Sequence, residues 1–268
     1  MSLSVWLLTI PQGLSATLVV GFFILFGVGI ILAVRRWIPP SRLKPHNDIA
    51  GFVFATLGVI YGVMLAFVVI DVWEQYDNAK EITDQESSVA FALYRDLNLY
   101  PNRAEADMAI AELRAFTHSV VHEEFPAMQT MQWESRTQAS LATQKASNRM
   151  SDAVRRIIPQ NLHEQALFSE ILKDVNSMAQ NRVKRLLAAR SDLPGVVWVV
   201  VVLGGLILLG FIALFGHENM RVHLILVVLL GTVTGGVIYV IVCLNFPFTG
   251  PVSIQPEGYE FLIELAGW

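Results

Sequence analysis

The sequence predicts an all-α polytopic membrane protein with four transmembrane helices, in two pairs that flank a helical extramembrane domain. Hydrophobic residues make up 54% of the 268 residues, and the mean hydropathy is +0.50. These apolar residues gather in four blocks that almost lack charge, each close to the roughly 20 residues that a helix needs to cross the hydrocarbon core. The stretch between the second and third blocks is charged and resembles soluble protein.

The first pair of spans is expected at about 14–34 and 49–70, and the second pair at about 195–215 and 222–246. Backbone polar groups in lipid must be satisfied within the segment, so each block is expected to be a helix. The resulting domains are an N-terminal transmembrane pair (1–70), a helical extramembrane domain (71–193), a C-terminal transmembrane pair (194–246) and a C-terminal tail (247–268).

The extramembrane domain is predicted to be helical throughout. No Gly or Pro occurs from Val63 to Tyr100, so the second span is expected to continue out of the membrane as one long helix that ends near Pro101. No run of alternating β-branched residues indicates a strand. Three further helices are expected, from Asn102 to about Glu124, over about 131–158, and over about 160–190.

Composition excludes several classes of function. The net charge of −4 gives no nucleic-acid footprint. The single cysteine, Cys243, rules out an intrachain disulfide and a Cys-based metal site. No Asp, Glu, Lys or Arg lies deep in a span, which argues against a proton pump or an ion-coupled transporter. The sequence has no nucleophile elbow and no phosphate-binding glycine loop, so no catalytic residue and no cofactor are predicted.

One pair of histidines has the spacing of metal ligands. His118 and His122 are four residues apart on a predicted helix, beside Glu123 and Glu124. Such a pair can share a metal ion, but the order of residues differs from the HExxH of zinc proteases. A solvated polar face is the favoured interpretation, and no metal site is predicted.

Small residues recur at spacings of three and four along the second span, which places them on one helix face. Small residues let helix backbones approach closely in lipid. Two interpretations stay open: ordinary tight helix packing, or packing of the second span against copies of itself around an axis. The packing residues are Gly51, Ala55, Gly58, Gly62 and Ala66, with a second GxxxG step at Gly231 and Gly235 in the fourth span.

An acidic stripe follows just beyond the second span. In a ring of identical subunits it would form stacked acidic rings that concentrate cations; in a monomer it would be a solvated face. If a pore runs along this helix, its lining within the span is expected at Gly58, Tyr61, Gly62, Leu65 and Val69. Tyr61, Leu65 and Val69 are the candidates for its narrow apolar part. Its wide part would then be lined by Asp71, Glu74, Asp77, Glu81 and Asp84.

Short segments along nearly the whole chain resemble the bestrophin-like membrane proteins of bacteria. They include His46-Asn47-Asp48, the Leu57–Gly62 stretch and Trp73-Glu74-Gln75-Tyr76, then Glu86, Glu124-Phe125-Pro126 and Arg185, and finally Phe246-Pro247-Phe248-Thr249-Gly250. One departure is visible, because Asn245 or Phe246 stands where the family's acidic residue is expected before the Pro-Phe pair.

The resemblance implies a function as well as a fold. Bestrophins are homopentameric anion channels with four spans, a cytosolic helical domain and a pore lined by the second span. The favoured hypothesis is therefore a homo-oligomeric ion channel that passes inorganic ions across the lipid bilayer of a bacterial inner membrane, with a pentamer as the implied ring. The alternative is a non-conducting scaffold or sensor whose helical domain binds a partner, and a membrane enzyme ranks third.

The membrane orientation has conflicting signals. The loop between the first two spans carries Arg35, Arg36, Arg42 and Lys44, which favours a cytoplasmic loop and an outer, periplasmic helical domain. A basic cluster before the third span, at Arg182, Lys184, Arg185 and Arg190, argues for the opposite. The bestrophin resemblance also implies a cytosolic domain. The loop charges favour the outer placement.

Labelling of a single cysteine tests this orientation. In a Cys243→Ala background, Asn102→Cys should react with a membrane-impermeant thiol reagent in intact spheroplasts, because the charge rule places residue 102 outside. Labelling that appears only after lysis would instead place the helical domain in the cytoplasm.

Overall fold

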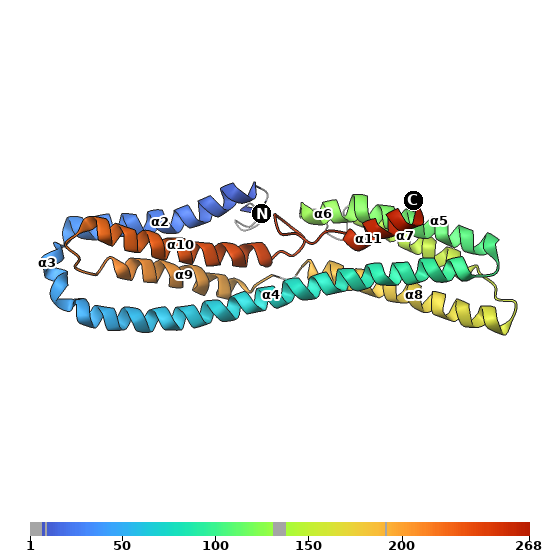
Figure 1. The fold of residues 1–268 in the computed structure, drawn as a ribbon, viewed down its shortest axis with the longest axis horizontal. Coiled ribbons are helices and arrows are strands. Elements are labelled where there is room, and N and C mark those ends of the chain that lie inside the picture. The colour runs from blue at the N-terminus through green and yellow to red at the C-terminus, as the bar shows by residue number, and fades with distance from the viewer. Residues whose placement is uncertain (1–6, 9, 131–137, 191) are drawn as a thin grey trace. The chain divides into compact units, whose positions relative to one another are not determined.

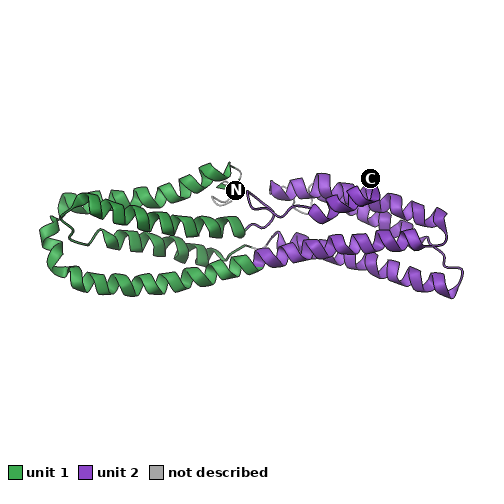
Figure 2. Ribbon diagram, viewed as in Figure 1, with its two compact units in different colours: residues 1–74, 192–245 green, residues 75–191, 246–268 purple. Residues whose placement is uncertain are grey.

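The computed structural model describes residues 7–8, 10–130, 138–190 and 192–268, and all regular structure within these ranges is helical (Figure 1). As predicted, four segments are long and apolar enough to cross a membrane. They contain α2 (Gln12–Trp37), α4 (Asn47–Leu99), α9 (Gly195–Ile212) and α10 (Met220–Leu244). The chain forms two compact units, unit 1 with residues 1–74 and 192–245, and unit 2 with residues 75–191 and 246–268 (Figure 2).

Helix α4 is a single helix of 53 residues. It follows α3 (Pro40–Leu43) and the 3₁₀ turn η1 (Lys44–His46). Its residues belong to unit 1 up to Glu74 and to unit 2 from Gln75 onward. The absence of helix-breaking residues between 63 and 100 explains why it continues without interruption.

Glycines let the helices of unit 1 approach closely. A Cβ atom on Gly235 of α10 would lie 2.8 Å from the Cα atom of Val20 in α2, and one on Gly231 would lie 3.2 Å from the Cα atom of Ile24. These two glycines therefore lie where α10 packs directly on the backbone of α2, as small residues do in membrane bundles.

The two short loops of unit 1 lie at the same end of its helices. The side-chain amide of Asn47 accepts from the backbone N–H of Gly216 (2.9 Å) and donates to the carbonyl oxygen of the same residue (3.4 Å). Lys44 forms an ion pair with Glu218 at 2.8 Å. Residue Asn47 thus both begins α4 and holds the α9–α10 loop beside it.

Unit 2 contains α5 (Arg103–Ser119), the π turn η2 (Val120–Glu124), α6 (Phe125–Gln129), α7 (Gln138–Arg155) and α8 (Leu162–Ala188). The helix that was expected to stop before Pro126 instead passes through the wide turn η2 into α6. Pro126 lies in the first turn of α6, where a missing N–H costs least. The beginning of the helix predicted over 131–158 lies outside the described residues.

The C-terminal tail contains a further helix, α11 (Glu257–Ala266), which the sequence analysis did not predict. Tyr259 and Leu262 of α11 are fully buried. The ring centroids of Phe91 and Phe261 are 5.4 Å apart, so α11 packs on the part of α4 that belongs to unit 2. Gly267 ends α11 with a left-handed backbone (φ 68°), the usual conformation at a helix C-terminus.

Two neighbouring glycines in α10 test this packing. Gly235→Ala should lower the free energy of unfolding by about 1–3 kcal/mol, because the added methyl meets the α2 backbone. Gly236→Ala is the matched control, since a Cβ there meets nothing within 4 Å. Thermal unfolding in detergent measures both, and equal stabilities would contradict the close contact of α10 with α2.

Candidate functional site

Helix α4 presents one face to its own chain along its whole length. Tyr61, Leu65, Val68 and Val72 are buried in unit 1. In unit 2 the buried positions continue at intervals of three, four and seven residues, through Ala79, Thr83, Glu86, Ala90 and Leu93. This spacing matches the helical period, so a single face of α4 is buried in both units.

Two of the predicted pore-lining residues lie on the buried face. Tyr61 and Leu65 are each 8% exposed. The Tyr61 hydroxyl donates to the carbonyl oxygen of Val201 in α9 at 2.8 Å, and its ring fills the space beside Gly204. Both side chains therefore pack inside their own chain, which argues against a pore-lining position for them.

The small-residue face of α4 points away from the rest of the chain. A Cβ atom on Gly58 or Gly62 would meet nothing within 4 Å, whereas one on Gly51 would just reach the Phe215 ring at 4.0 Å. Ala55 and Ala66 are exposed. Only 11% of the most apolar window of this span is buried within the protein, compared with 39% for α10. Of the four candidate spans, the one containing α4 is the least covered by its own chain.

The predicted acidic stripe is also exposed. Glu74, Asp77, Glu81 and Asp84 all reach the surface of α4, on the side opposite Glu86. Asp71 is exposed as well but lies toward one flank, and Val69 is half-buried. Within unit 2, the last three carboxylates of the stripe border an open groove of about 780 Å³ whose other wall is α8.

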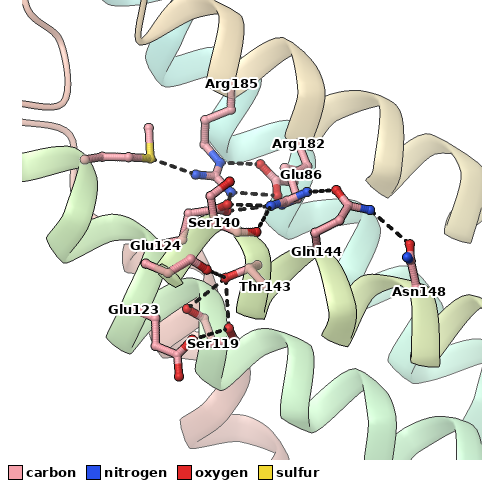
Figure 3. A network of polar contacts seen from close by, with 12 residues as sticks. Glu86, Ser119, Glu123, Glu124, Ser140, Thr143, Gln144, Asn148, Arg182 and Arg185 are labelled. Carbon is pink, nitrogen blue, oxygen red and sulfur yellow. Dashed lines mark hydrogen bonds and ion pairs between the residues drawn. The ribbon is translucent and has the colours of Figure 1, made fainter. Parts of the chain in front are cut away.

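A buried ionic network fixes the opposite face of α4 (Figure 3). Arg185 of α8 donates through Nε to Glu86 at 2.6 Å and through Nη2 to Glu124 at 2.7 Å. Arg182, one turn earlier, forms a second pair with Glu124 at 2.6 Å. The side chains of both ion pairs with Arg185 are at most 1% exposed. Two cations and two carboxylates from three elements thus neutralise one another inside unit 2.

Neighbouring groups complete this network. The Arg182 Nη1 atom donates to the side chain of Gln144 at 2.6 Å, and the Arg185 guanidinium lies 4.8 Å from the centre of the Phe125 ring. Burial alone would raise the pKa of Glu124, but Arg185 and Arg182 outweigh it and hold the pKa below its usual range. Burial and the Glu86 carboxylate raise the pKa of the Tyr259 hydroxyl well above its usual value.

Sequence reasoning missed this network. It treated Arg182 and Arg185 as free basic charge near the third span, whereas both are buried and paired. Their value as a signal of membrane orientation is therefore reduced. The available signal was that Glu86, Glu124 and Arg185 all belong to the segments that carry the family resemblance.

The histidine pair lies in a different place, beside a cleft of about 580 Å³ between α5 and α7. The rings of His118 and His122 stack with centroids 5.5 Å apart. Burial, His122 and Arg114 lower the pKa of His118. Within the described ranges, no three His, Cys, Asp or Glu side chains converge as metal ligands.

Comparisons with known proteins agree with the architecture. The family model for the Bestrophin-like domain matches residues 21–259. A single-substitution variant of a bacterial bestrophin homologue from Klebsiella pneumoniae superposes with a TM-score of 0.69 at 11% identity, covering 93% of this chain and 98% of that chain. A membrane protein with a glycine-to-alanine substitution superposes with a TM-score of 0.65 at 12% identity, and the match covers 94% of this chain and 97% of that chain. No curated protein matches the sequence.

Removal of one buried charge tests the network. Glu124→Gln should lower the free energy of unfolding by about 3–5 kcal/mol, because the buried Arg182 would lose its carboxylate partner and Arg185 would lose one of its two. Glu123→Gln is the matched control, since the Glu123 side chain is exposed and accepts a hydrogen bond from the uncharged Ser119 hydroxyl at 3.0 Å. Chemical unfolding of the two variants compares them, and equal midpoints would show that the network does not stabilise unit 2.

Proposed function

The chain belongs to the bestrophin-like family, and on that premise we propose that it is a homo-oligomeric ion channel whose pore is lined by the exposed face of α4. The observation that carries this proposal is the low coverage of the α4 span, of which only 11% of the most apolar window is buried. The same helix continues into a row of exposed carboxylates, which require water rather than lipid.

The three sides of α4 suit three different neighbours. Each residue turns the helix by about 100°, so the buried side, with Tyr61 and Leu65, faces the chain's own α9. The small-residue side, with Gly58 and Gly62, lies roughly a quarter turn away and suits close packing against α4 of the next subunit. The side opposite the buried one would then face the axis of a ring.

The side assigned to the axis changes character along the helix. Val59, Val63 and Ile70 are more than half exposed and would form an apolar constriction that gates by wetting. Glu74 and Asp77 follow on the same side and begin the acidic part. With this side of α4 facing the axis, Val59 and Val63 line the narrow part of the proposed pore in place of Tyr61 and Leu65.

The acidic part would set the selectivity. Repeated around a ring, the carboxylates create a negative potential that attracts cations and repels anions. Salt at physiological concentration screens this potential beyond about 8 Å, so the effect depends on a narrow vestibule. The charge pattern therefore favours cations, whereas the bestrophin resemblance implies anions.

Bilayer recordings under an ionic gradient test the selectivity. The wild-type protein should give a cation-leaning reversal potential, and Glu74→Gln with Asp77→Asn should move that potential toward zero. The control double variant is Asp107→Asn with Glu170→Gln, which removes the same charge from exposed positions on α5 and α8. Complete absence of current would exclude the channel and favour a non-conducting scaffold. Anion selectivity that the double variant leaves unchanged would make the stripe only a solvated face.

Subunit packing has its own test. Gly62→Leu should reduce the particle size in detergent without unfolding the protomer, because a side chain there meets nothing within its own chain but would separate neighbouring α4 helices. Gly29→Leu on α2, also in open space, is the control and should leave the size unchanged. Mass photometry reports the size, and identical particles for all three proteins would mean that this face of α4 contacts lipid.

A further inference from the structure

Unit 1 contains a cavity of about 500 Å³ between α2, α9 and α10. Its walls are apolar and partly aromatic, with Phe22 and Phe23 from α2, Trp198 from α9 and Ile238 from α10. The volume falls within the range of small-molecule sites in proteins. Among the described residues of the lining, one carries a carboxylate, Asp192. A largely apolar cavity with one charged group is the pattern of a site for an amphiphile.

The cavity extends from one end of the helices toward the middle of the apolar segment. Asp192 precedes α9, and Val202, which also lines the cavity, is seven residues into that helix. At 1.5 Å per residue, Val202 lies about 10 Å below the helix end. The hydrocarbon of one leaflet is about 15 Å thick. The cavity is therefore deep enough to hold about two thirds of the length of one acyl chain, starting at its headgroup end.

The mouth of the cavity is polar and well anchored. Asn245, at the end of α10, accepts from the backbone N–H of Leu193 at 3.0 Å and donates to Oδ1 of Asp192 at 2.6 Å. Asp192 itself is exposed. A carboxylate can accept about four hydrogen bonds, so this contact leaves capacity for a cationic group of a ligand. The indole N–H of Trp198, one turn into α9, can donate to an oxygen of the same ligand.

We propose that this cavity binds phosphatidylethanolamine. One acyl chain would lie between α2, α9 and α10, the ammonium group would pair with Asp192, and a phosphate or ester oxygen would accept from Trp198. Charge complementarity selects this lipid, because the negative carboxylate at the mouth attracts an ammonium group and repels the net negative charge of phosphatidylglycerol. The site does not involve α4 and does not depend on ion conduction.

The proposal also accounts for Asn245 at the position where the family's acidic residue was expected. A second carboxylate next to Asp192 would have repelled it, whereas the amide holds Asp192 at the cavity mouth through a hydrogen bond. The amide thus adds no second negative charge beside Asp192, whose carboxylate suits the positive charge of the ethanolamine group.

Native mass spectrometry of the purified protein tests the site. The protein is exchanged into detergent with equal amounts of palmitoyl-oleoyl phosphatidylethanolamine and palmitoyl-oleoyl phosphatidylglycerol, and the retained lipids are counted. The wild-type protein should retain the ethanolamine lipid about fivefold more than the glycerol lipid, the size expected of one partly exposed ion pair. Equal retention of the two lipids by the wild-type protein would overturn the proposal.

Three variants separate the charge from the cavity. Asp192→Asn keeps an oxygen that accepts from Asn245 and should abolish the preference while both lipids still bind. Val202→Phe should reduce retention of both lipids, because the larger side chain fills the apolar space. Glu218→Gln, which removes a carboxylate from the opposite end of unit 1, should change neither.

Each variant can also contradict the proposal. A preference that survives Asp192→Asn would show that the carboxylate does not select the lipid. Retention unaffected by Val202→Phe would show that the lipids bind elsewhere. If Val202→Phe instead reduces the particle size, the cavity is covered by a second copy of the chain and not by lipid.

Discussion

Two buried arginines impose the strongest constraint on this protein. Arg185 is completely buried and needs the carboxylates of Glu86 and Glu124 within hydrogen-bond distance, because an unpaired buried charge would cost several kcal/mol. Glu86 belongs to α4, so the network fixes which side of α4 faces the interior of unit 2. The helical period then determines which residues of the same helix face outward. The exposed acidic row on α4 is therefore a consequence of the buried ion pairs behind it.

Glycine serves two distinct purposes in the apolar segments. In α9 and α10, Gly204 and Gly235 admit the Tyr61 ring and the backbone of α2, so both are used within the chain. Gly58 and Gly62 of α4 face open space. The same GxxxG spacing thus supports folding of the protomer in one helix and, in the proposed channel, packing between subunits in another. The structure distinguishes the two cases because it shows what each missing side chain would meet.

Polar side chains hold both ends of the apolar helices. Asn47 binds both backbone polar groups of Gly216 at one end of unit 1, and Asn245 joins Asp192 and Leu193 at the other. Each asparagine forms hydrogen bonds with backbone groups near the place where a helix begins or ends. Such groups need a protein partner where they are shielded from water, because lipid tails offer no hydrogen bonds. The cavity proposed to hold a lipid opens beside the second of these anchors.

The sequence by itself determined the fold class, the four apolar spans, the long uninterrupted helix and the family, because hydropathy, length and the absence of Gly and Pro act locally. It did not determine which side of α4 is buried, so Tyr61 and Leu65 were assigned to a pore although they pack inside the chain. It also missed α11 and the pairing of Arg182 and Arg185 with carboxylates that are 58 to 99 residues distant in the chain. These features depend on which residues meet in space, and an amphipathic pattern specifies a face without specifying its partner. Only the tertiary structure decided them.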